Sequence, residues 1–349
     1  MPRDLDRKDS HLSLALEERV EFPSEDATGF GALRFDHDAL PEIDRSEVRT
    51  DVELLGKKLA LPLVVGAMTG GTPRAGEVNR RLALAAERCG VGFALGSQRK
   101  MLVGPAARAS YAVRDAAPGL PLLFGNLGAV QLNYGVGIPQ LRHLVADVGC
   151  DAFNFHLNPL QEVIQPEGDT RFGGLVAKLA AVVPEMGVPV LLKEVGAGIS
   201  ETTALKIRAI PVAGVETSGV GGTSWSKIES LRTRDPVQRS TGELFARWGI
   251  PTAESVATCR RILPDRVVIA SGGIRNGIEV AKALALGADA VALALPLLRA
   301  AERSVDAAVE VIARVAEELR TALFLTGCAT VSELRQRRLL RGRDLTAVP

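Results

Sequence analysis

Short apolar runs rich in β-branched residues recur along this chain, and longer stretches with helical periodicity lie between them. The apolar runs predict eight strands: Leu61–Ala67, Val91–Leu95, Pro121–Gly125, Asp151–His156, Val188–Glu194, Gly214–Thr217, Val267–Ala270 and Ala288–Ala294. The periodic stretches predict helices that include Arg74–Cys89, Gln140–Val148, Gly173–Val183 and Ile278–Ala285. This alternation predicts an α/β protein whose parallel sheet closes into a (β/α)8 TIM barrel. An open doubly wound sheet is the alternative.

Parts of the chain depart from this alternation, although all of it reads as one domain of 349 residues. We expect an N-terminal extension over 1–60, the barrel over 61–300, and C-terminal helices with a basic tail over 301–349. Within the extension, LRFDHDALPEIDRSEV (33–48) resembles a hairpin. Residues 218–250 join strands six and seven by a connection long enough to be either functional or disordered. Near the end, Ser304–Leu325 predicts an outer helix, and Arg335–Arg343 a solvated basic tail.

Polar residues gather where the predicted strands end. The segment His156-Leu157-Asn158-Pro159-Leu160-Gln161-Glu162 places an imidazole, two amides and a carboxylate directly after a buried run. An α/β barrel presents its chemistry at the C-terminal rim of its strands, so repeated bursts of this kind predict an enzyme. Any one of these residues on its own is equally compatible with a capped turn. We interpret His156 as a substrate contact, with a hydrogen-bonded core imidazole as the alternative.

Two glycine-rich segments predict an anion site. Ser271-Gly272-Gly273-Ile274-Arg275-Asn276-Gly277 follows strand seven and opens a helix, where bare backbone N–H groups and a helix N-terminus favour phosphate. The segment GVGGTSW (219–225) follows strand six, and Ser218 and Thr223 can add hydroxyl donors. Tight turning alone is the structural alternative for these glycines.

The remaining rim residues suit a flat, electron-rich heterocycle with a second anion beside it. Ala67-Met68-Thr69, Ser97 and Asn126 end strands one to three, and Lys193 ends strand five, where it can hold negative charge on a reduced flavin ring. A Lys193–Glu194 surface pair is the alternative. The second anion site is predicted from Arg7, Lys8, His11, Arg99 and Lys100, with Glu162 as a carboxylate for Mg²⁺ on a diphosphate.

Composition narrows the function classes. Lys and Arg total 42 against 41 Asp and Glu, so the net charge of +1 offers no general attraction to nucleic acid or membranes. Aromatic residues make up 4%, too few for a base-stacking platform. The four cysteines form no CxxC pair, and we expect reduced, mostly buried thiols. The start MPRDLDRKDSHLSL is charged and lacks an apolar signal core, so a cytoplasmic protein is predicted. HExxH and Cys/His clusters are absent from the sequence, which disfavours zinc.

These motifs together resemble the FMN-dependent type 2 isopentenyl-diphosphate Δ-isomerases over nearly the whole chain. The matching segments are RKDSHL (7–12), ALPEID (39–44), AMTGG (67–71), GSQR (96–99), GNLGAVQ (125–131), HLNPLQE (156–162), KEVGAGIS (193–200), GVGGTSW (219–225) and ASGGIRNG (270–277). HLNPLQE together with RK and MTGG is specific to that family, whereas SGGIR is shared with many flavin barrels.

The resemblance implies conversion of isopentenyl diphosphate to dimethylallyl diphosphate with reduced FMN, Mg²⁺, and NADPH as flavin reductant. Carried onto this sequence, it implies FMN contacts at Ala67, Met68, Thr69, Ser97, Asn126, Lys193, Ser218, Thr223, Gly273, Ile274, Arg275, Ala294 and Leu295. The implied substrate contacts are Arg7, Lys8, His11, Ser97, Arg99, His156 and Gln161, with Glu162 on Mg²⁺. Gln161, His156 and Lys193 are the implied catalytic residues; Gln161, the flavin and an ordered water stay open as the proton acceptor. A homotetramer or homo-octamer is also implied.

Two departures and two rival readings accompany this resemblance. Glu216 stands where family members usually have Asp, and Thr170-Arg171 replaces a more acidic pattern. Another FMN barrel oxidoreductase is the nearest rival. The hydroxy-acid oxidases need a late histidine, however, and this sequence has none after His156; the nucleotide dehydrogenases need a cysteine, and 218–250 has none. A flavin- or prenyl-phosphate-binding protein without catalysis is the other alternative.

Overall fold

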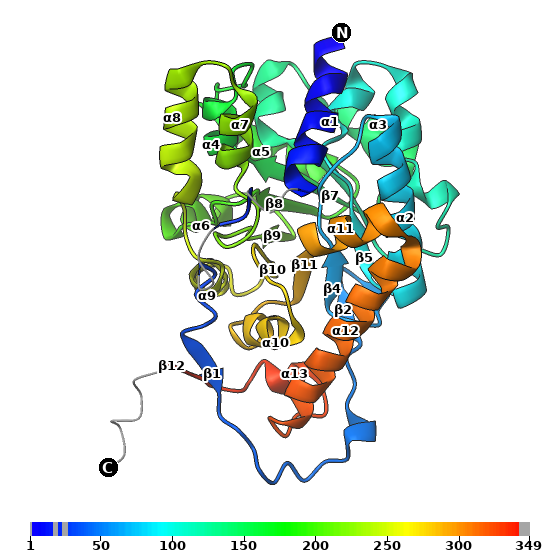
Figure 1. The fold of residues 1–349 in the computed structure, drawn as a ribbon, viewed down its shortest axis with the longest axis vertical. Helices are drawn as coiled ribbons and strands as arrows, with labels where there is room; N and C mark the ends of the chain where they lie inside the picture. The colour runs from blue at the N-terminus through cyan, green and yellow to red at the C-terminus, as the bar shows by residue number, and fades with distance from the viewer. Residues whose placement is uncertain (1, 17–19, 23–26, 342–349) are drawn as a thin grey trace.

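The computed structural model describes residues 2–16, 20–22 and 27–341, with residues 2–7 and 105 described as backbone only. Its centre is a closed barrel of eight parallel strands, with helices packed around it (Figure 1). Around the barrel the strands are β4 (Leu63–Val65), β5 (Gly92–Ala94), β6 (Leu123–Gly128), β7 (Ala152–Leu157), β8 (Val190–Glu194), β9 (Gly214–Glu216), β10 (Val267–Ser271) and β11 (Ala290–Leu293). Strand β11 pairs with β4 and closes the ring. The predicted TIM barrel is confirmed, and all eight predicted strands are present.

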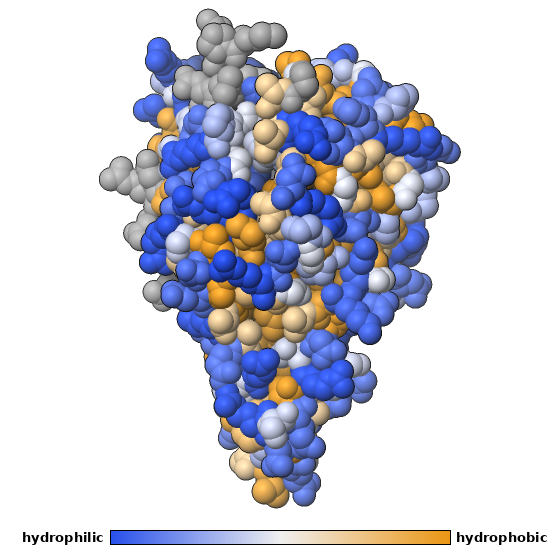
Figure 2. Space-filling view, turned by 90° about the vertical axis from the view of Figure 1, so that its right-hand side faces the viewer, coloured by the Kyte–Doolittle hydropathy of each residue, from blue (hydrophilic) through white to orange (hydrophobic). Residues whose placement is uncertain are grey.

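Helices connect and surround these strands. They are α1 (Pro2–Leu16), α2 (Pro73–Cys89), α3 (Ile138–Val148), α4 (Pro159–Ile164), α5 (Leu175–Val182), α6 (Glu201–Arg208), α7 (Trp225–Arg232), α8 (Pro236–Leu244), α9 (Thr252–Ile262), α10 (Gly277–Ala285), α11 (Leu295–Arg303), α12 (Val305–Phe324) and α13 (Val331–Leu334). The four helices predicted between the strands and the outer helix α12 are confirmed. Figure 2 shows the side of the molecule that carries α2 and α12, where hydrophilic side chains predominate around smaller hydrophobic areas.

Strand alternation divides the barrel into an inner and an outer set of side chains. In β4, Leu63 and Val65 join the large core between strands and helices, whereas Val64 joins a separate small cluster inside the barrel. This inner cluster also contains Phe124 and Leu191, together with Leu54 from outside the barrel strands. Apolar packing therefore fills the lower part of the barrel, and the polar residues lie above it at the strand ends.

The N-terminal extension closes the lower end with a hairpin that the sequence analysis did not locate. Strands β2 (Val52–Leu54) and β3 (Lys57–Leu59) pair through a two-residue turn in which Leu55 and Gly56 both have positive φ. Leu54 and Leu59 reach into the inner cluster. The hairpin predicted over 33–48 is wrong, because β1 (Leu33–Phe35) pairs instead with β12 (Leu339–Arg341) near the other end of the chain.

Two other expectations outside the barrel change. Residues 218–250 are not an open loop, because α7 and α8 form within them and stand beside the mouth of the barrel (Figure 1). Residues 335–338 of the basic tail are exposed, as expected, but they also contact the rest of the protein: Arg335 forms an ion pair with Asp289, and Arg337 donates to the sulfur of Cys328. Positions 342 and 343 lie outside the described residues.

The cysteines are free thiols, and Cys150, Cys259 and Cys328 are buried while Cys89 is half-buried. Over the described residues, none of the helices has both the length and the apolar character that crossing a bilayer demands.

Candidate active site

A large cavity opens at the carboxyl ends of the barrel strands and encloses about 1400 Å³ when its mouth is included. Its floor consists of polar side chains that point inward from neighbouring strands: Asn126 on β6, His156 on β7, Lys193 on β8, Glu216 on β9 and Ser271 on β10. Parallel pairing aligns these residues in register; His156, for example, lies opposite Lys193. Polar groups from five strands therefore converge on one space.

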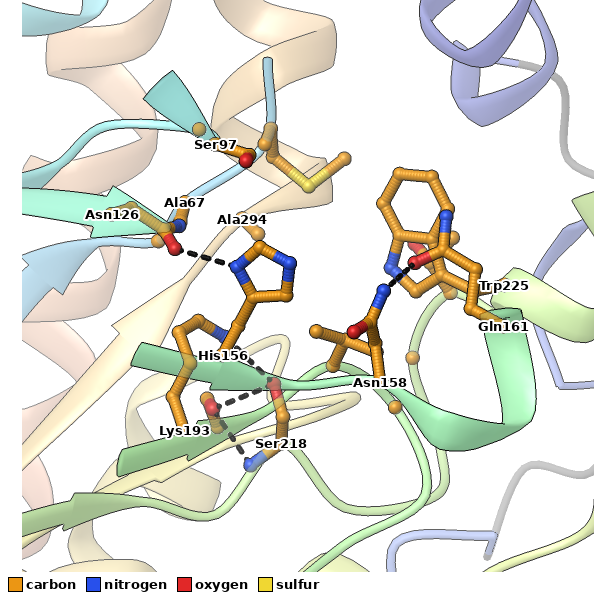
Figure 3. Close-up of a pocket in the computed structure, with 18 of the residues that line it drawn as sticks. Ala67, Ser97, Asn126, His156, Asn158, Gln161, Lys193, Ser218, Trp225 and Ala294 are labelled. Carbon is orange, nitrogen blue, oxygen red and sulfur yellow. Dashed lines mark hydrogen bonds between the residues drawn. The ribbon is translucent and has the colours of Figure 1, made fainter. Parts of the chain in front are cut away.

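Asn126 orients the imidazole of His156 and fixes its tautomer (Figure 3). The amide nitrogen of Asn126 donates to the carbonyl of Leu95 at 2.9 Å, so its oxygen is the atom that faces His156 Nδ1 at 2.8 Å. Nδ1 must then carry the hydrogen, which leaves Nε2 as an acceptor. Burial, and secondarily the charge of Lys193, lowers the pKa of His156 to about 3. This imidazole is therefore an uncharged acceptor rather than an acid near neutral pH.

Gln161 is fixed at both ends of its amide. Asn158 Nδ2 donates to Gln161 Oε1 at 3.2 Å, and Gln161 Nε2 donates to Glu229 Oε1 at 3.1 Å. Glu229 on α7 is fully buried, pairs with Arg232 and lies 2.9 Å from His11 Nε2. Burial alone would raise the pKa of Glu229, but His11, Arg232 and Gln161 together hold the pKa of that carboxyl below its ordinary value. A charged carboxylate thus lies behind the Gln161 amide.

Glu162, the next residue along α4, is buried beside the cavity. Its carboxylate accepts from Asn158 Nδ2 at 2.8 Å and from the backbone N–H of Asp169 at 2.7 Å. Burial raises the pKa of Glu162, although these two donors oppose the rise. The Asp169 carboxylate in turn pairs with Arg99 at 2.6 Å and accepts from Gln131 at 2.8 Å. Two carboxylates, those of Glu162 and Asp169, therefore lie close to the Arg99 guanidinium at this side of the cavity.

The two glycine-rich loops lie against each other at the side of the cavity. Gly272 and Gly273 have positive φ, and a Cβ on either would approach the backbone of Gly219 or Gly221 within 2.4 Å. Close packing is thus a structural reason for these glycines. Gly273 and Ile274 also line the cavity, and their backbone N–H groups donate to no protein acceptor within the described ranges. These open donors suit a phosphate.

An N-terminal segment lies beside this glycine cradle. Residues 20–22 pair with residues 222–224 through an antiparallel bridge between Glu21 and Thr223. The carboxylate of Glu21 binds Arg275 at 2.6 Å and Arg299 at 3.0 Å. Arg275 is therefore engaged by protein as well as facing the cavity.

Helix α1 covers the mouth of the barrel (Figure 1) and contributes Lys8 and His11 to the cavity lining. His11 packs edge-on against Trp225 with ring centroids 5.4 Å apart, and Asp9 on the same helix accepts from Thr72 at 2.7 Å. Burial lowers the pKa of His11, so this residue offers a hydrogen-bonding nitrogen rather than a charge. The charge near the mouth comes from Lys8, Arg99 and the neighbouring lysine at position 100.

The structure brings nearly all of the predicted site residues to this one cavity. Those that line it are Lys8, His11, Ala67, Met68, Ser97, Arg99, Asn126, His156, Gln161, Glu162, Lys193, Ser218, Thr223, Gly273, Ile274, Arg275, Ala294 and Leu295. Thr69 is buried below the rim and lines a small adjoining space under α1 instead. The side chain of Arg7 lies outside the described residues. The Lys193–Glu194 surface pair is wrong, because both residues are buried and Lys193 pairs with Glu216.

Several contacts of this arrangement were not predicted from the sequence. Glu229 and Trp225 lie on α7, within a segment that we interpreted as a loop. The signal that was available is their spacing of four residues, which places both on one helical face. Asn158 lies inside the HLNPLQE motif, but nothing local indicates that it bridges Gln161 and Glu162. Asp169 contacts Glu162 through its backbone N–H and Arg99 through its carboxylate, and the sequence pattern does not reveal this combination.

The donor set fits a flavin nucleotide and a diphosphate-bound Mg²⁺. The open backbone N–H groups of Gly273 and Ile274 are suited to a phosphate. The buried ammonium of Lys193 is suited to the carbonyl edge of a ring. Glu162 offers a single carboxylate, and no cluster of three or more His, Cys, Asp or Glu occurs in the part of the chain that the structure describes. Mg²⁺ commonly takes one or two carboxylates and completes its shell with phosphate oxygens and water.

Comparisons with known proteins agree with this assignment. The profile of the family described as FMN-dependent dehydrogenase matches residues 162–341. The isopentenyl-diphosphate delta-isomerase of Synechococcus sp. is 45% identical over 96% of both chains. The proteins of the same description from Mycolicibacterium vanbaalenii and Pyrococcus horikoshii are each 42% identical, over 98% and 95% of this chain and 97% and 90% of theirs.

Solved structures agree in fold. A mandelate oxidase crystallised with (S)-2-phenylpropionate aligns with a TM-score of 0.67 at 21% identity, over 97% of this chain and 98% of its own. A putative lactate oxidase of Pediococcus acidilactici aligns with a TM-score of 0.69 at 17% identity, over 97% and 93%. At such identities the likeness concerns the barrel fold alone.

Proposed function

The chain belongs to the type 2 isopentenyl-diphosphate Δ-isomerase family, and from that membership and its cavity we propose that it interconverts isopentenyl and dimethylallyl diphosphate. The reaction uses reduced FMN as an acid–base cofactor, Mg²⁺ on the diphosphate and NADPH as flavin reductant. The observation that carries the proposal is the convergence of Gln161, Glu162 and Lys193 on one cavity that also holds an open phosphate cradle. A homotetramer or homo-octamer is part of the same proposal.

Within this proposal the mouth of the cavity binds the diphosphate. Lys8 and Arg99 supply positive charge, and Glu162 would be the carboxylate that holds Mg²⁺, which would neutralise charge on the diphosphate. Arg99 is preset by its ion pair with Asp169 and has to share its donors when the diphosphate arrives. The neutral acceptor Nε2 of His156 suits a hydrogen-bond donor in the cavity.

The remaining residues handle a cation and a proton. Reduced FMN, when bound in this cavity, would supply negative charge and a proton. Protonation of an unactivated alkene gives a tertiary carbocation, which is acidic enough to lose a proton to a neutral oxygen. Gln161 is fixed in place for this step, and the Glu229 carboxylate behind it can stabilise the arriving positive charge. Trp225 and Met68 line the cavity with apolar surface that keeps water away from the cation.

The test is an anaerobic incubation of the purified protein with FMN, a reductant, Mg²⁺ and isopentenyl diphosphate, followed by detection of dimethylallyl diphosphate. We expect product when the flavin is reduced and none when it is oxidised. Gln161→Ala is the companion variant, which should bind FMN normally but lose most turnover. Absence of product from wild-type protein with bound, reduced flavin would overturn the proposed substrate.

A further inference from the structure

The floor of the cavity contains a buried polar cluster made of Lys193, Glu216, Ser218 and Ser271, which we call the floor cluster. Lys193 and Glu216 are neighbours in register on β8 and β9, and their side chains are only 5% and 4% exposed. Glu216 Oε1 lies 3.1 Å from Lys193 Nζ and accepts from Ser271 Oγ at 2.9 Å. Ser218 has a φ of +41°, a left-handed conformation that is uncommon for a residue other than glycine.

The ammonium group of Lys193 has a protein acceptor for each of its three N–H bonds. Besides Glu216, it donates to the carbonyl of Glu194 at 2.7 Å and to Ser218 Oγ at 3.4 Å. The contact with Ser218 is the longest of the three. A ligand in the cavity can therefore gain a hydrogen bond from Lys193 by displacing Ser218 alone, while Glu216 stays in place.

Charge in this cluster is balanced before any ligand arrives. An unpaired ammonium at this depth would be strongly destabilising, and the Glu216 carboxylate offsets that cost. The pair presents an N–H donor to the cavity but little net positive charge. A lysine without a carboxylate partner would instead attract an anion strongly, because burial reduces screening.

We propose that Glu216 is a positioning and charge-setting residue, which orients Lys193 toward the flavin ring and limits how strongly that lysine stabilises the ring's negative charge. The inference rests on the proposed function only in requiring FMN to bind in this cavity. The role of Glu216 follows from acid–base catalysis, in which a group transfers protons best when its pKa lies near the working pH. Full stabilisation of the anionic ring by Lys193 would lower the proton affinity of the ring too far, and Glu216 prevents that.

The test is an anaerobic spectroscopic pH titration of reduced FMN bound to wild-type protein and to Glu216→Gln, which keeps the side-chain shape and removes the charge. The transition between neutral and anionic reduced flavin should move down by about one pH unit or more in Glu216→Gln, because one nearby charge typically shifts a pKa by that much. The midpoint potential of the bound flavin should rise in the same variant. Glu216→Asp, which keeps the charge, should titrate close to wild type.

Three outcomes would overturn the inference: an unchanged transition in Glu216→Gln, a transition at higher pH, or loss of FMN from this variant while Glu216→Asp binds it. The last outcome would mean that Glu216 builds the site rather than setting its charge. Turnover of isopentenyl diphosphate is measured separately. A protein that shows the expected titration but makes no dimethylallyl diphosphate would refute the proposed substrate and leave the role of Glu216 standing.

Discussion

His156 should make the protein lose stability in mild acid, because the folded state resists protonating it. Burial lowers the pKa of His156 to about 3, whereas an unfolded chain binds a proton with the ordinary pKa of 6.5. As the pH falls below 6.5, the unfolded state takes up a proton that the folded state cannot accept. The stabilising contribution is therefore complete above pH 6.5 and is lost progressively toward pH 3.

The magnitude follows from the two pKa values. Over each pH unit in which only the unfolded state binds this proton, the free energy of unfolding falls by about 1.4 kcal/mol. Between pH 8 and pH 5, His156 alone should then lower the free energy of unfolding by about 2 kcal/mol. Replacement of His156 by Asn retains a polar side chain beside Asn126 but removes the titrating group.

The assay is urea unfolding of flavin-free protein from pH 5 to pH 8, in which wild type and His156→Asn are compared at each pH. A constant difference between the two proteins reports lost contacts; only the change of that difference with pH reports protonation. His143→Asn is the matched control, since it removes an exposed imidazole from α3. If wild type and His156→Asn show the same dependence on pH, His156 is not held neutral by the fold and the reasoning fails.

Three further predictions concern the site and the barrel. Glu162→Gln should weaken Mg²⁺-dependent substrate binding about tenfold or more while FMN remains bound; an unchanged KM and Mg²⁺ requirement would remove Glu162 from the metal role. Glu229→Gln should lower stability by about 2–4 kcal/mol in thermal unfolding, because Arg232 loses a buried partner, and should reduce kcat by disturbing Gln161; equal melting temperatures would contradict this. Gly277→Ala should destabilise the protein by about 1–3 kcal/mol, since its Cβ would lie 2.4 Å from the backbone nitrogen at position 319, whereas Gly173→Ala, with open space around it, should not.

The barrel was predictable because its strands are continuous apolar runs, but the residues at which the strands end were not predictable. Strand β6 was expected to stop at Gly125 and instead continues through Asn126 to Gly128. Gly125 serves close packing rather than a turn, as a Cβ there would lie 2.6 Å from the ring of Phe153. Glycine in a sequence does not distinguish these two uses.

Residues of the candidate site were predictable where they follow a strand, and less so where they arrive from elsewhere. Strand ends place Asn126, His156 and Lys193 on one rim by topology alone. Glu229 reaches Gln161 at the edge of this cavity from a helix inserted after β9. Its pairing with Arg232 follows helical spacing, but its contact with His11 becomes visible only in three dimensions. The N-terminal extension shows the same limit, since the partner of β1 lies near the opposite end of the chain.

The pairing of β1 with β12 has a consequence for synthesis on the ribosome. Leu33 lies opposite Arg341, and barrel closure likewise joins Leu63 in β4 to Val291 in β11. At ordinary translation rates β12 is synthesised roughly 15–60 s after β1, because about 300 residues separate the two strands. Neither the ring nor the extension can be completed on a nascent chain that lacks its C-terminal part. Nascent chains of this protein should therefore keep unpaired strand edges exposed until the last strands are released.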